Sequence, residues 1–212
     1  MSQGTEIYKN RALYSMQATI LSLMDKIQWR HHGIGVLQGY IREDVNPEIR
    51  IHIWSDRLLK PGIDLSGDVH DHRFDMVSHV LYGSVAHEVW IETPDEKGDH
   101  EMLTLTHARA AAATDYHGPT APLTGRYSVD RQLYVIDAGK SYTFPAKKFH
   151  RSPFLNYLPK DVVVTCIEKH DQQNAPARLL YPVHTPPVMA FGHKPDAAVV
   201  QEVIELAKRR LS

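Results

Sequence analysis

Two histidines, His70 and His72, are separated by a single residue in a stretch whose β-branched and aromatic content is typical of a strand. Side chains two positions apart on a strand point the same way, so both imidazole rings are expected on one face. Two neighbouring neutral imidazoles make half of a divalent-metal site. A third histidine, His150, follows a predicted turn at residues 144–148 and begins another predicted strand. Three histidine ligands leave coordination positions open, which is typical of a catalytic rather than a structural metal site.

Charged residues beside the histidine pair are candidates for catalytic work. Asp75 is a fourth metal ligand, an acceptor that orients a histidine ligand, or a residue that shapes the turn, and the sequence leaves these alternatives open. Arg73 is either a solvated turn residue or a guanidinium that binds a substrate carboxylate with two hydrogen bonds. Asp71, expected on the face opposite the two histidines, is interpreted as structural.

A further candidate, His52, lies in a stretch at residues 48–55 that alternates isoleucine with polar or aromatic side chains. This alternation predicts a strand with Arg50 and His52 on one face. In a half-buried strand that face is exposed to solvent, whereas in a small barrel it can line a ligand cavity, and both alternatives remain open. His87 and His107, also on predicted strands, are interpreted as core or surface histidines rather than ligands.

Residues 67–83 and 139–150 resemble the two sequence motifs of the cupin superfamily. In the second stretch a proline lies midway between Gly139 and His150 at the family's spacing, and Gly83 lies at the expected distance from the histidine pair. Three positions depart from the family pattern, which has glutamate, glycine and asparagine there: Met76, Lys147 and Phe154. Because the glutamate ligand is missing, the chain resembles a three-histidine cupin of the cysteine-dioxygenase-like type.

The resemblance implies a metal-dependent enzyme whose metal ligands are His70, His72 and His150. Similar three-histidine cupins include thiol dioxygenases, gentisate-type ring-cleaving enzymes and diketone-cleaving enzymes, all of which use iron. The implied activity is that of an Fe(II) dioxygenase that binds O2 and a small carboxylate-bearing substrate. Zinc, nickel and manganese are the other candidate metals. One of three arginines is expected to bind the substrate anion: Arg50, Arg73 or Arg151.

Two other functions remain open at this point. A non-redox isomerase, lyase or hydrolase would use the metal as a Lewis acid, with His52 or Asp75 as the base. A metal-binding or small-ligand-binding module would have the same ligands without turnover. The class also leads us to expect a homodimer, because cupins commonly pair through their sheets.

The predicted elements that position these residues are mainly strands. Eight or more short strands with turn signals between them favour a double-stranded β-helix, the RmlC-like jelly roll of the cupins, with a helix near each end. We expect one domain over residues 1–212, with a helix at about 8–28, the barrel at about 33–170 and a C-terminal extension and helix at about 172–211. Residues 101–124 fit neither the helical nor the strand period. Because the interval between the two motifs is long for a cupin, part of it is interpreted as an inserted loop, a lid over the barrel mouth.

The composition argues against several classes of partner. The 212-residue chain has a formal net charge of −1 and no basic stripe, so no nucleic-acid partner is expected. No apolar run approaches the roughly 20 residues that span a membrane, and no signal-peptide pattern is present, so no membrane partner is expected. Cys166 is the single cysteine, which favours a reducing compartment and a cytoplasmic location.

Overall fold

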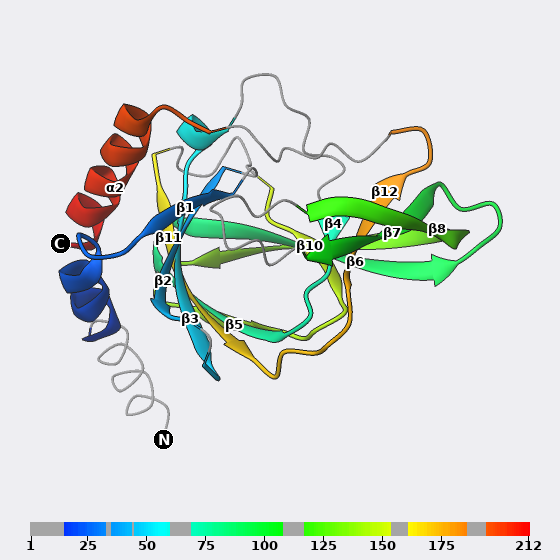
Figure 1. Cartoon of the computed structure of the whole chain (residues 1–212), viewed down its shortest axis with the longest axis horizontal. Coiled ribbons are helices and arrows are strands. Elements are labelled where there is room, and N and C mark those ends of the chain that lie inside the picture. The colour runs from blue at the N-terminus through cyan, green and yellow to red at the C-terminus, as the bar shows by residue number, and fades with distance from the viewer. Residues whose placement is uncertain are drawn as a thin grey trace.

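The computed structural model describes residues 15–32, 35–43, 45–59, 69–107, 117–153, 161–185 and 194–212, with the backbone alone described at 105–107 and 117–124. Its strands form two antiparallel sheets in a barrel-like β sandwich, and a helix lies near each end of the described chain (Figure 1). The predicted fold class, mainly β with terminal helices, is confirmed, and the arrangement is consistent with a jelly roll.

The first sheet has six strands in the order β1-β2-β3-β11-β5-β9. Their bounds are Trp29–His32 (β1), Val36–Arg42 (β2), Glu48–Trp54 (β3), Val163–His170 (β11), Asp75–Tyr82 (β5) and Ser141–Phe144 (β9). The other six strands close into a small barrel in the order β10-β4-β12-β7-β8-β6. Their bounds are Phe149–Arg151 (β10), Val69–His70 (β4), Ala177–Pro182 (β12), His100–His107 (β7), His117–Asp137 (β8) and Ser84–Pro94 (β6).

Two helices cover the outer face of the first sheet, one at residues 15–23 and the other, α2, at Ala197–Leu211 (Figure 1). Asp196 caps α2, since its carboxylate accepts a hydrogen bond from the Ala198 backbone N–H at 2.7 Å. Three basic residues in the last turn interact favourably with the negative end of the helix dipole. Apolar side chains of both helices pack against Ile51 and Ile53 of β3, which are fully buried. The isoleucine face of β3 therefore points outward to the helices, and the face carrying Arg50 and His52 points inward.

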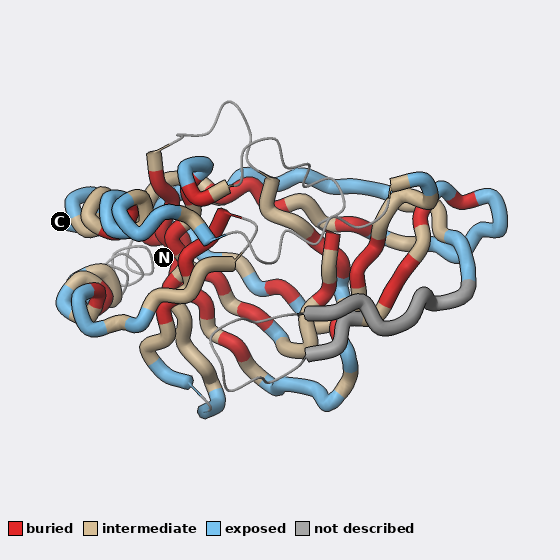
Figure 2. Tube along the Cα trace, turned by 45° about the horizontal axis from the view of Figure 1, so that its top comes forward, coloured by how far each residue is buried: buried red, intermediate tan, exposed pale blue. Residues whose placement is uncertain are grey.

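A separate apolar cluster fills the small barrel, and Figure 2 shows the buried positions that run along its strands. Val69 of β4 and Phe149 of β10 belong to this cluster. Because side chains alternate along a strand, the next residues, His70 and His150, point out of the small barrel. Packing of the small barrel thus turns both histidines toward the first sheet.

Two parts of the chain differ from the sequence-based expectation. Residues 101–107 and 117–124, for which the sequence predicted no regular element, belong to β7 and the start of β8 and pair as antiparallel strands. The part between them, residues 108–116, lies outside the described residues, so an inserted loop there stays a prediction. Residues 177–182, expected in an extension beyond the barrel, form β12 between β4 and β7. No helix within the described ranges is long and apolar enough to cross a membrane.

Candidate metal centre

Strand pairing brings three histidines together on the side of the small barrel that faces the first sheet. His150 on β10 lies directly opposite His70 on β4, and directly opposite residues share a face of a sheet. His72 follows two residues after His70, and its Nε2 lies 2.8 Å from the Nε2 of His150. The ligand nitrogens of the three residues all lie within 4.8 Å of one another. The predicted ligand set is therefore assembled by the fold.

Burial keeps two of these rings in the form that binds metals. Burial, followed by repulsion from the neighbouring rings, lowers the pKa of His72 and of His150 well below the usual 6.5. A neutral imidazole offers a lone pair, which an imidazolium lacks. Imidazole nitrogens bind at about 2.0–2.1 Å, so two nitrogens on one ion lie about 3 Å apart, close to the His72–His150 spacing. The donor set fits a divalent ion such as iron, zinc or nickel.

A buried ion pair anchors the loop that carries His70 and His72. The Asp71 side chain has no exposed surface. It accepts two hydrogen bonds from Arg178, one from the backbone N–H at 2.6 Å and one from the side-chain Nε at 2.7 Å. Arg178 Nη2 in turn donates to the Lys147 carbonyl at 2.9 Å. These bonds connect the first histidine loop, β12 and the turn before His150. The contacts agree with the structural role predicted for Asp71.

The turn before His150 explains one departure from the cupin pattern. Lys147 has a φ of +63°, a left-handed conformation that glycine adopts without steric cost. Its Nζ donates to the Pro176 carbonyl at 2.6 Å and its backbone N–H to the His72 carbonyl at 2.9 Å. Asp75 also binds this turn, because its Oδ1 accepts the Ala146 N–H at 2.7 Å. Asp75 is outside the three-histidine group, and its contact is the one expected of a residue that shapes the turn.

His52 lies on the inner face of the first sheet, close enough to the centre to interact with it. Burial, followed by Arg50 and neighbouring charges, lowers its pKa well below 6.5, and it contributes in turn to the lowered pKa of His72. Both ring nitrogens are buried and have no hydrogen-bond partner among the described residues. A buried imidazole without partners is costly, so this position suits a ring that meets a bound water or ligand.

A cationic cluster connects this inner face to a pocket. Lys169 Nζ binds Glu48 Oε1 at 2.9 Å, and Arg50 binds the same carboxylate. Burial lowers the pKa of Lys169 to about 8, with Arg50 adding to the effect and Glu48 opposing it. The ammonium lies 4.2 Å from the centre of the Phe74 ring, and that ring stacks on His72 with centroids 4.7 Å apart. Phe74 thus contacts both the cluster and the metal centre.

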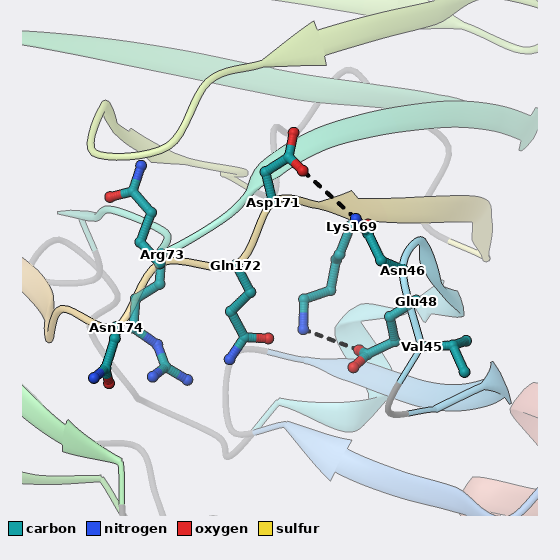
Figure 3. Close-up of a pocket in the computed structure, with 9 residues that line it drawn as sticks. Val45, Asn46, Glu48, Arg73, Lys169, Asp171, Gln172 and Asn174 are labelled. Carbon is teal, nitrogen blue, oxygen red and sulfur yellow. Dashed lines mark hydrogen bonds and ion pairs between the residues drawn. The ribbon is translucent and has the colours of Figure 1, made fainter.

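The pocket has a volume of about 600 Å³, and its lining is polar except for Val45 (Figure 3). Arg73 and Lys169 lie on either side of Gln172 in this view. The three arginines expected to bind a substrate anion lie in different places. Arg73 lines the pocket, and Arg50 pairs with Glu48. Arg151 instead pairs with Glu88 and lies over the Trp90 ring of the small barrel.

Sequence reasoning missed the role of His87 as a neighbour of the metal centre. His87 is 3% exposed, its Nδ1 lies 3.4 Å from the Nδ1 of His150, and burial lowers its pKa to about 4. It lies two residues before Val89, which is directly opposite His150, so both histidines share a face. Alternation along β6 could have placed His87 inward, but only the strand register shows which residue it meets.

Comparisons with known proteins give no assignment at the sequence level, since no protein-family model and no curated protein sequence matches the chain. A structure of the DMSP lyases RdDddP and RnDddQII is similar with a TM-score of 0.37 and 12% identity, over 71% of this chain and 60% of that one. An oxalate oxidase structure is similar with a TM-score of 0.36 and 13% identity, over 86% and 77% of the two chains. The chain thus spans less than two thirds of the DMSP lyase chain. At these scores neither likeness identifies an activity.

Proposed function

We propose that this chain is a metal-dependent enzyme of the cupin superfamily, and that it acts as an Fe(II) dioxygenase on a small carboxylate-bearing molecule. The observation that carries the proposal is the convergence of His70, His72 and His150, with nitrogens within 4.8 Å of one another, on a scaffold consistent with a jelly roll. All three members of the group are histidines, which bind metals as neutral imidazoles, and no carboxylate joins them among the described residues, so the set leaves coordination positions open.

The residues of the chain have separable tasks in this proposal. His70, His72 and His150 hold the ion, which when bound supplies the O2 and one-electron chemistry that side chains lack. Three neutral ligands leave the positive charge of the site uncompensated, so an anionic substrate group is attracted to it. Arg73 and Lys169 line the pocket, and in this proposal they bind a substrate carboxylate.

A second candidate is a non-redox reaction in which the ion serves as a Lewis acid. One observation favours it: both ring nitrogens of His52 are buried and unpartnered in the described structure, so a ring lone pair is available to take a proton from a bound substrate. Asp75 is less suited to this role, because its carboxylate is already bonded to the Ala146 N–H.

The test is metal analysis of protein purified without oxygen, followed by oxygen uptake after Fe(II) loading. We expect about one ion per chain in the wild type and its loss in His72→Ala. His79→Ala is the matched control, since His79 bonds Ser141 and Glu168 rather than the histidine group. Oxygen uptake that depends on His72 supports the dioxygenase, whereas bound zinc or nickel without oxygen chemistry favours the Lewis-acid reaction. A wild type that takes up no metal refutes both.

A further inference from the structure

His87 is a buried histidine that contacts one proposed metal ligand, His150, but is not itself part of the ligand set. Its ring packs against the rings of Tyr142, Phe144 and His150, with centroids 4.7, 4.9 and 5.0 Å away. Two aromatic neighbours and 3% exposure hold the imidazole in one place. Its Nδ1 faces the Nδ1 of His150 at 3.4 Å. The two histidines are thus positioned to share one hydrogen bond.

The direction of this hydrogen bond follows from the ligand role of His150. The Nε2 of His150 faces the Nε2 of His72 at 2.8 Å, so Nε2 is the nitrogen turned to the other ligands. A nitrogen that binds a metal uses its lone pair and carries no proton, which leaves the proton of the neutral ring on Nδ1. His150 Nδ1–H then donates, and His87 Nδ1 accepts.

We propose that His87 is a positioning residue for the metal centre: it accepts the Nδ1–H of His150 and thereby sets the tautomer and the ring plane in which His150 presents Nε2 to the ion. The inference rests on the proposed metal-binding function. Histidine ligands generally need such an acceptor, and losing it typically lowers metal affinity about 10- to 100-fold.

The same tautomer has a consequence at the far side of the His87 ring. With Nδ1 accepting, the proton of neutral His87 lies on Nε2. That atom is buried and has no hydrogen-bond partner in the described part of the chain. His87 therefore presents one N–H donor that an ordered water or a polar atom of a bound ligand can satisfy.

The experiment compares zinc affinity, measured by competition with a chromophoric chelator, and the visible spectrum of the cobalt-loaded protein. His87→Phe preserves the ring but removes the acceptor, and we expect about 10- to 100-fold weaker zinc binding with an altered cobalt spectrum. His87→Asn, whose amide oxygen lies near the position of Nδ1, should retain most of the affinity. His87→Gln, whose amide lies nearer the position of Nε2, should not. His79→Phe is the matched control and should bind zinc as the wild type does.

The outcomes separate this inference from the proposed function. Wild-type protein that binds neither zinc nor cobalt overturns both. Normal affinity and an unchanged cobalt spectrum in His87→Phe overturn the positioning role alone, because the ligand set would then work without the acceptor. If His87→Phe does not fold, the pair of amide variants decides: equal affinity in His87→Asn and His87→Gln contradicts the proposal.

Discussion

Replacing Arg178 with methionine should destabilise the protein through the buried Asp71 carboxylate. Arg178→Met keeps much of the apolar stem of the side chain but removes the Nε donor at 2.7 Å and the Nη2 bond to the Lys147 carbonyl. The backbone N–H of residue 178 still donates to Asp71 at 2.6 Å. The variant therefore leaves a fully buried carboxylate with one hydrogen bond and no counter-charge.

The expected magnitude follows from this burial. Removing one partner of a buried ion pair costs about 3–5 kcal/mol, because the remaining charge is left uncompensated. The surviving backbone bond places the expectation at the lower end, about 3 kcal/mol. For a chain of this size, 1 kcal/mol corresponds to a change in Tm of about 2–4 °C, so Tm should fall by roughly 6–12 °C.

The assay is urea denaturation of the wild type, Arg178→Met and a control, Arg57→Met. Arg57 pairs with Glu202 at 3.3 Å, but the two side chains are 53% and 65% exposed, so its loss should cost under about 1 kcal/mol. Adding Asp71→Asn to Arg178→Met should recover part of the loss, because an amide carries no charge to bury. A free energy of unfolding for Arg178→Met equal to that of the control would refute the reasoning.

Three further predictions concern single side chains. Cys166 is 2% exposed and burial raises its pKa to about 12, so the folded protein should resist iodoacetamide; labelling as fast as in denaturant would contradict this. Lys147→Gly should leave the free energy of unfolding within about 1 kcal/mol of wild type, because glycine accepts the positive φ, whereas Lys147→Val should be clearly less stable by urea denaturation. The pKa of Lys169 is about 8 in the folded protein, against about 10.4 for a lysine in the unfolded chain. Between about pH 8 and 10.4 this side chain therefore binds fewer protons when folded than when unfolded, so the free energy of unfolding should rise with pH there. We expect the rise, measured by urea denaturation at a series of pH values, to be smaller in Lys169→Met. A rise of equal size in this variant would show that other groups cause it.

Local periodicity made part of the site predictable. His70 and His72 share a face because every strand alternates its side chains, whatever it pairs with. The alternation along β3 likewise predicts that Ile51 and His52 lie on opposite faces of the strand. Which of the two faces lies inside was not predictable, since it depends on the two helices that pack on the isoleucines. Because helices cover the outer face of this sheet, the apolar side of β3 faces the helices and the polar side faces inward.

The sequence by itself determined the residue types, their local faces and the two turns that end in the histidine strands. Tertiary structure alone decided which distant residues meet: His150 reaches His72 across 78 positions and His87 across 63. These contacts arise from the register of β10 against β4 and β6, which is set by backbone hydrogen bonds between strands far apart in the chain. The physical reason is that side-chain periodicity is encoded within each strand, whereas the choice of partner and register depends on how the whole chain buries its apolar faces.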